Sequence, residues 1–248
     1  MGQYTRRSAI LISRIRAGLP LLSCLSFLAL APHHALSQSS ASLNKCGSDE
    51  RIVRIAIHAS ASLKGWTRTR EQTWLDAQFR EANRLFEPIK LCFVGQLSKP
   101  LSARDNRIRT RAQRTRLGRL NDHQHPGDIT LFIVDRLDDI DLIGQQIRGV
   151  HWRDPKNRRD KRWIILSRLA PSMVLAHELG HYFSLPHSKD AISIMNKRKR
   201  SDPPVGERRF SDAETRRMAR FTKLLFRRGY LIRRTDGETH DSMALPRP

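Results

Sequence analysis

Three histidines and one glutamate between residues 177 and 187 have the types and spacing needed for metal chemistry. Residues 177–181 fit the pattern H-E-x-x-H, and two histidines four positions apart lie one turn along the same face of a helix. His177 and His181 can therefore direct two imidazoles at one metal ion, while Glu178 lies beside the ion with a carboxylate free to hold a water molecule. His187 follows six residues after His181, and a helix that ends between them lets the chain turn back toward the metal.

The three imidazoles suit zinc. A catalytic zinc ion takes three protein ligands in a tetrahedral arrangement and keeps its fourth position for water. The bound water has a pKa of about 7, so hydroxide is available at neutral pH. Glu178 can take the proton of that water as a general base and pass it to a leaving amine. The sequence therefore predicts one catalytic Zn²⁺ ion bound by His177, His181 and His187, with Glu178 as the catalytic residue.

A helix over residues 171–183 is expected to position the first two histidines. Pro171 can occupy its first turn, where a missing N–H costs nothing. Leu185-Pro186 is expected to end it. The apolar surface that anchors this helix comes from Met173, Val174, Ala176 and Leu179.

The full pattern, H-E-x-x-H-x-x-x-x-x-H followed by Ser188 and then Met195, resembles the metzincin metallopeptidases, the matrixin branch in particular. In that family a methionine in a tight turn, seven residues after the serine, lies beneath the zinc without binding it, and Met195 falls in this register. The family glycine between the second and third ligands is replaced here by Ser184. The resemblance therefore implies a positive φ at Ser184, with a modest strain that glycine avoids.

The resemblance covers roughly residues 50–230 and implies an α+β catalytic domain. Its parts are a mixed, twisted sheet, the active-site helix, the Met-turn and a C-terminal helix. The implied activity is that of a zinc-dependent endopeptidase acting on protein or peptide substrates, and in the family an extended substrate pairs with an edge strand. Residues 147–152 are our candidate for that strand. The competing hypothesis is a basic envelope- or polyanion-binding protein with this fold but no turnover, which would have no use for the general base Glu178.

Hydrophobic patterning predicts the remaining elements. Strands are expected at residues 51–59, 91–94, 128–134, 147–152 and 162–167, and a helix at 71–86. Ser211 should cap a last helix, with Glu214 completing a capping box, and this helix should bury Met218, Phe221 and Leu225. The arginine-rich stretch 102–122 is weakly helical or a surface excursion.

Residues 1–37 have the layout of a secretory signal peptide. Four arginines precede an apolar run from Leu19 to Ala31, which is too short to span a bilayer comfortably. We expect a secreted or periplasmic protein, with an uncleaved membrane anchor as the alternative. The predicted organisation is a signal peptide at 1–37, an N-terminal extension at 38–50, a zinc metallopeptidase domain at 51–232 and a flexible tail at 233–248.

Two cysteines follow the signal segment, Cys46 and Cys92. In an oxidising compartment they most simply form one disulfide that ties the N-terminus to a strand. The alternative is that residues 44–49 resemble the matrixin cysteine switch, in which a Cys-Gly of the pro-segment covers the zinc. That alternative leaves no room for a folded prodomain and leaves Cys92 unpaired, so we favour the disulfide.

The chain is strongly basic, with a formal net charge of +22. Basic runs at residues 104–119, 156–162 and 197–200 could attract anionic envelope surfaces or acidic substrates, or could simply be a solvated surface. The last run predicts a preference for acidic side chains beyond the scissile bond. Because no nucleic-acid motif accompanies the runs and few aromatic residues are interleaved, we expect no specific nucleic-acid partner. We also expect a monomer without a stable membrane span.

Several other side chains have both a functional and a structural interpretation. His151 could contact substrate, although a packing role is the simpler expectation. His123 and His125 form an H-x-H that could hold a second metal ion near Asp128. Asp135, Asp138, Asp139 and Asp141 could gather calcium, but their spacing fits no known loop. The tryptophans, at positions 66, 74, 152 and 163, are expected in the core or the cleft wall.

Overall fold

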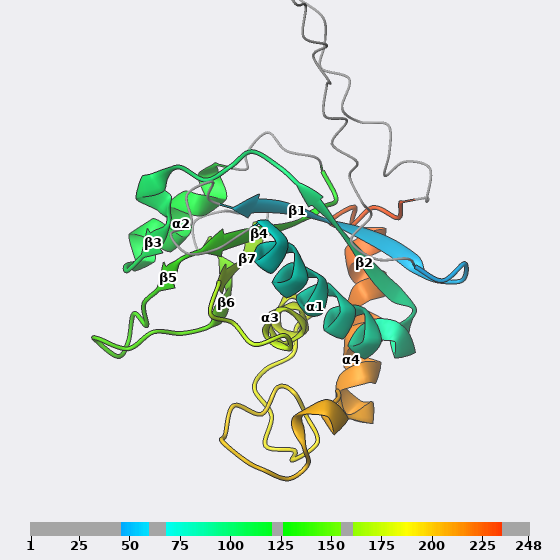
Figure 1. The fold of residues 1–248 in the computed structure, drawn as a ribbon. Helices are drawn as coiled ribbons and strands as arrows, with labels where there is room; N and C mark the ends of the chain where they lie inside the picture. The colour runs from blue at the N-terminus through cyan, green and yellow to red at the C-terminus, as the bar shows by residue number, and fades with distance from the viewer. Residues whose placement is uncertain (1–45, 60–67, 121–125, 155–160, 235–248) are drawn as a thin grey trace, which may run out of the picture. The chain divides into compact units, whose positions relative to one another are not determined.

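The computed structural model describes residues 46–59, 68–120, 126–154 and 161–234 (Figure 1). All of them belong to one compact unit, residues 40–248. The predicted signal segment, the H-x-H at 123–125, Trp66 and the chain beyond residue 234 lie outside the described residues, so these predictions stay predictions.

A five-stranded mixed sheet organises the domain (Figure 1). Its strand order is β2-β1-β4-β7-β6, with β1 (Arg51–Ala59), β2 (Leu91–Leu97), β4 (Ile129–Val134), β7 (Arg162–Ser167) and β6 (Gly149–Arg153). The first four strands are parallel to their neighbours, and β6 is antiparallel to β7 at the edge. The mixed sheet expected from the sequence is therefore confirmed, and the segment predicted as an edge strand is one.

Helices cover both faces of the sheet. The helices α1 (Arg68–Phe86), α3 (Val174–Tyr182) and α4 (Asp212–Arg227) pack on one face around strand residues such as Ile55, Leu131 and Ile164. The next residue along each strand points to the other face, where Phe132 and Ile165 pack with Leu117 of α2 (Arg111–Arg119). Strands covered on both faces can be apolar throughout. Among the described residues, no helix has both the length and the apolar character that a membrane crossing requires.

The described part of the arginine-rich stretch, residues 102–120, has more regular structure than its sequence suggested. It contains a short 3-10 helix η2 (Ala103–Asp105), the strand β3 (Arg107–Ile108), which pairs with β5 (Arg136–Leu137), and helix α2. Thr110 begins α2 with a capping box: its hydroxyl accepts from the Gln113 backbone N–H, and the Gln113 side chain accepts from Thr110 N–H. Thr110-x-x-Gln113 is the local signal that the low apolar content of the stretch obscured.

The end of the domain follows the prediction closely. Ser211 and Glu214 form the expected capping box of α4. Met218 and Leu225 are buried, whereas Phe221 is half-buried. The remaining 3-10 helices are η1 (Glu87–Ile89) and η3 (Val205–Glu207).

The disulfide between Cys46 and Cys92 is present, with the two Cα atoms 5.7 Å apart. It joins the start of the described chain to β2, as predicted. Because Cys46 is engaged in this bond, its thiol is not available to cover a metal, and the cysteine-switch alternative does not describe this state of the chain. At the other end, Arg234 of the predicted tail bridges to Ile52 of β1 and pairs with buried Asp128.

The start of helix α3 is held by another helix. α3 begins at Val174, so Pro171 precedes its first turn instead of occupying it as predicted. The buried side chain of Gln78, on α1, accepts a hydrogen bond from Leu175 N–H and donates to the carbonyls of Ala170 and Pro171. No side chain of the chain segment itself caps this end, so Gln78 takes the place of a local N-cap.

Replacing Gln78 by Leu should therefore loosen the start of α3. The change leaves a buried N–H and two carbonyls without these partners, and we expect the free energy of unfolding to fall by about 3 kcal/mol in a urea titration. Gln72→Leu, on the exposed side of the same helix, is the matched control and should change stability by no more than about 0.5 kcal/mol. Equal stability of the two variants would contradict the capping role.

Candidate metal centre

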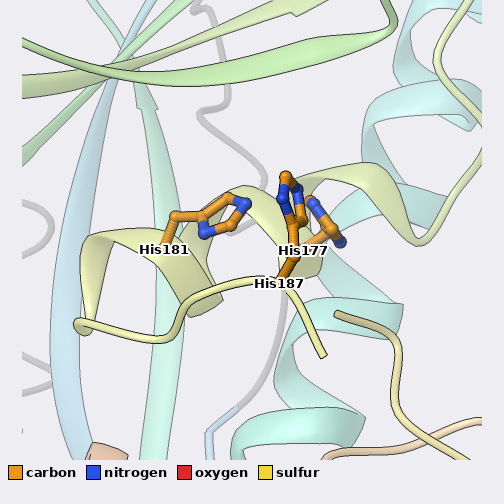
Figure 2. A group of neighbouring side chains, drawn as sticks. All are labelled: His177, His181 and His187. Carbon is orange, nitrogen blue, oxygen red and sulfur yellow. The ribbon is translucent and has the colours of Figure 1, made fainter. Parts of the chain in front are cut away.

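The three predicted histidines lie together at one end of α3. His177 and His181 project from the helix and His187 from the segment that follows it (Figure 2). One ring nitrogen from each histidine lies within 4.8 Å of the other two. The ring centroids are 4.7 Å apart for His181 and His187, 4.8 Å for His177 and His181, and 5.6 Å for His177 and His187. The structure therefore brings all three imidazoles to one point.

A tight turn after α3 returns the chain toward the first two histidines. Leu185 N–H donates to Gly180 C=O and Ser184 N–H to His181 C=O, which is the Schellman pattern of helix ends. Ser184 has a φ of +74°, as the comparison with the family glycine predicted. A left-handed residue costs about 1–2 kcal/mol when it is not glycine, and the two hydrogen bonds hold Ser184 in that conformation.

Backbone carbonyls fix the orientation of both helix histidines. Nδ1 of His177 lies 2.8 Å from the Ile194 carbonyl, and Nδ1 of His181 lies 2.7 Å from the Leu185 carbonyl. A carbonyl oxygen can only accept, so each Nδ1 carries the proton and each Nε2 is left with its lone pair. Burial lowers the pKa of His177 to about 4 and also lowers the pKa of His181. Both rings are therefore neutral near pH 7, the form that binds a metal.

The methionine turn packs directly against the helix. Met195 is fully buried, and a Cβ built on Gly180 would lie only 2.6 Å from its Sδ. The absence of a side chain at residue 180 is thus what lets the turn approach α3. The turn is fixed from α4, because the Ser193 hydroxyl donates to the Glu214 carboxylate and accepts from Met195 N–H.

Glu178 is buried on the side of α3 that faces the edge strand, with 5% of its surface exposed. Its Oε2 accepts a 2.7 Å hydrogen bond from the His151 backbone N–H of β6. Burial raises the pKa of Glu178 to about 8, while this hydrogen bond and the charge of Arg114 act in the opposite direction. Oε1 has no hydrogen-bond partner among the described residues, so one carboxylate oxygen is fixed and the other is available.

The histidines and Glu178 line a cleft of about 710 Å³. The edge strand β6 forms one side of it. Arg148 C=O accepts from Ser167 N–H of β7, and because backbone direction alternates along an antiparallel strand, Gly149 and His151 turn their N–H and C=O groups away from β7. The cleft also contains exposed cations, Lys197 and Arg217 among them.

The other residues singled out in the sequence, His151, the tryptophans and four aspartates, lie in different parts of the domain. The ring of His151 lies in the cleft wall, 5.8 Å from the ring of Tyr182. Trp163 is in the core, and Trp152 and Trp74 are half-buried. The four aspartates do not form a metal cluster among the described residues. Their partners are Arg168 for Asp135, Arg136 for Asp138, Arg111 for Asp141, and backbone N–H groups for Asp139.

The donor set fits a zinc ion. In a tetrahedral zinc site with Zn–N bonds near 2.0–2.1 Å, the ligand nitrogens lie roughly 3.3 Å from one another. The observed separation is within 4.8 Å, so the rings would turn toward the ion on binding. Such a site uses three neutral imidazoles as ligands and a carboxylate next to the bound water. Here two oriented imidazoles lie on the helix, the third lies on a separate segment, and a carboxylate lies beside them.

Comparison with solved structures finds similar folds among metalloproteinases. Metalloproteinase-II from Bacteroides fragilis is 12% identical, with a TM-score of 0.47 over 73% of this chain and 57% of that one. Archaemetzincin from Methanopyrus kandleri is 18% identical, with a TM-score of 0.46 over 69% of this chain and 96% of that one. The chain thus spans little more than half the length of the Bacteroides protein. No protein-family model matches the sequence, and a search of curated proteins finds no match.

Gly149 was not anticipated as a site residue, yet it sets the distance between β6 and α3. A Cβ there would lie 2.7 Å from Val174 Cγ1 and 3.0 Å from Glu178 Cγ. We expect Gly149→Ala to cost about 1–3 kcal/mol of unfolding free energy through overpacking. It should also speed hydrogen exchange at the His151 amide, which Glu178 protects. Gly206→Ala, which meets nothing within 4 Å, is the control, and unchanged exchange at His151 would refute the spacer role.

Proposed function

We propose that the protein is a zinc-dependent endopeptidase whose metal is held by His177, His181 and His187. The observation that carries the proposal is the convergence of three imidazole nitrogens within 4.8 Å, beside a buried carboxylate that has one oxygen available. When bound, a Zn²⁺ ion would lower the pKa of a coordinated water to about 7 and polarise the scissile carbonyl.

Glu178 moves the proton in the proposed reaction. Its Oε2 is fixed by the His151 N–H, which leaves Oε1 to accept a proton from the attacking water and deliver it to the leaving amide nitrogen. Burial raises the pKa of Glu178 to about 8 in the absence of a metal ion, and the positive charge of a bound Zn²⁺ would lower this pKa and favour the carboxylate that accepts the proton. The same residue thus serves as base and then as acid.

The edge of β6 is the proposed binding place for an extended peptide. The backbone groups of Gly149 and the His151 carbonyl, which face away from β7, can pair with a substrate strand, which gives affinity without dependence on sequence. The hydrogen bond between His151 N–H and Glu178 links this strand to the carboxylate. A substrate bound there would lie next to the proton-transferring group.

A protein that only binds polyanions has no use for this arrangement. Burying a carboxylate costs free energy unless the group is well paired, and Glu178 accepts only one hydrogen bond among the described residues.

We further propose that the protein is exported, because the Cys46–Cys92 disulfide is typical of oxidising compartments.

The carboxylate can be tested without disturbing the ligands. Glu178→Gln keeps the side-chain size but cannot accept the proton, so we expect kcat/KM for peptides in a quenched-fluorescence library to fall by about 100- to 10,000-fold. Zinc content, measured by mass spectrometry of the metal, should stay at the wild-type value. Cleavage at the wild-type rate in this variant would show that the proposed proton transfer is wrong.

The ligand assignment has its own test. We expect the purified protein to bind one equivalent of zinc, and His177→Ala, His181→Ala and His187→Ala each to reduce the bound zinc to near zero after dialysis. His151→Asn, in the same cleft but outside the cluster, should keep the full equivalent. A His187→Ala protein that retains zinc as tightly as the wild type would exclude His187 as a ligand.

A further inference from the structure

Arg114 is a buried arginine in the wall of the catalytic cleft. It lies on α2 with only 3% of its surface exposed, and its side chain is part of the cleft lining. Its guanidinium carbon lies 5.1 Å from the ring centre of Trp152, on the edge strand. Nη2 donates to the Asp138 carbonyl at 2.7 Å. These contacts place a fixed cation above β6, on the other side of the strand from α3.

The described residues do not use all the hydrogen-bond donors of Arg114. A guanidinium has five N–H donors, and the structure shows one hydrogen bond, to the Asp138 carbonyl. Nε is buried without a partner among the described residues. A buried charge is costly unless it is paired and hydrogen-bonded. An anion that accepts from the remaining N–H groups of Arg114 would therefore bind favourably.

The neighbouring acids do not supply that partner. Asp141 pairs with Arg111 at 2.6 Å, and Asp138 pairs with Arg136 through its carboxylate. Asp139 accepts from the backbone N–H groups of Asp141 and Leu142. No carboxylate among the described residues lies within 4.0 Å of the Arg114 guanidinium. Arg114 is nevertheless close enough to Asp139, Asp141 and Glu178 to interact with their charges, most strongly with Asp139.

We propose that Arg114 binds a carboxylate of the substrate and so determines specificity at this cleft. This inference rests on the proposed peptidase function and adds its substrate class, peptides that carry a carboxylate near the scissile bond. A carboxylate can take two N–H donors of a guanidinium at once, which makes arginine selective for this group over a neutral amide. The ring of Trp152 makes a cation–π contact with the guanidinium of Arg114.

The carboxylate has two chemical sources, an acidic side chain and the C-terminus of the peptide. Both present the same planar group to Arg114. Recognition of a C-terminus would restrict cleavage to bonds near the end of a chain, whereas recognition of Asp or Glu would permit internal cleavage. Exposed Lys197 and Arg217 in the same cleft add a positive field that attracts either kind of peptide.

Matched peptides separate these sources. One series moves a single Glu through three positions on each side of the scissile bond, and each member has a Gln counterpart. A second pair differs only in a free or amidated C-terminus. We expect one series or the other to show a carboxylate preference in kcat/KM of about 10- to 100-fold, the worth of a hydrogen bond to a charged group. Either outcome supports the proposal and identifies the source.

Variants then assign the preference to Arg114. In Arg114→Gln the preference, taken as the ratio of kcat/KM for acidic and neutral peptides within the same variant, should fall to near unity. Arg119→Gln, on the same helix and exposed, removes the same charge outside the cleft lining and should keep the preference. If Arg114→Gln does not fold, Arg114→Lys keeps a charge without the planar fork and should retain only part of the preference.

Binding keeps this test separate from the proposed activity. Calorimetric titration of the zinc-loaded Glu178→Gln protein with the same peptides measures the preference without turnover, and the double variant with Arg114→Gln should lose it. Failure to cleave any peptide, with the binding preference intact, would count against the peptidase and not against Arg114. Equal binding of acidic and neutral peptides, or a preference that survives in a folded Arg114→Gln protein, would overturn the proposal.

Discussion

The close packing of α3 against its surroundings is the constraint on which the site depends. Two histidines on one helix can point at a common metal from the spacing alone. The third histidine and the carboxylate join them only if other segments lie at fixed distances from that helix. Two glycines set those distances. Gly180 admits Met195 beneath the helix, and Gly149 admits the edge strand beside it. A side chain at either position would push the neighbouring segment away.

The hydrogen bonds around α3 explain how this packing is maintained. Gln78, on α1, accepts a hydrogen bond from a backbone N–H of the first turn of α3. The turn at Ser184 donates hydrogen bonds to backbone carbonyls of its last turn. The carbonyls that orient His177 and His181 belong to Ile194 and Leu185, residues of the two segments that pack against the helix. The orientation of each imidazole is thus tied to tertiary structure, and such hydrogen bonds are what usually fix the tautomer and orientation of histidines in metal sites.

The edge strand connects the proposed metal site to the opposite face of the sheet. Its backbone holds Glu178 through His151 N–H, and its alternating side chains face two different layers. His151 faces Tyr182 of α3, whereas Trp152 faces Arg114 of α2. One short strand therefore joins the proposed proton transfer on one side to the proposed carboxylate recognition on the other.

The sequence by itself determined the features that depend on local spacing. H-E-x-x-H fixed the helix face of His177 and His181, alternating β-branched residues predicted β1, a short apolar run predicted β7, and Ser211 with Glu214 predicted the start of α4. Only the tertiary structure decided what depends on contacts between distant segments. The cap by Gln78, the spacing at Gly149 and the burial of Arg114 left no local pattern, because the partner of each lies on an element far away in the chain.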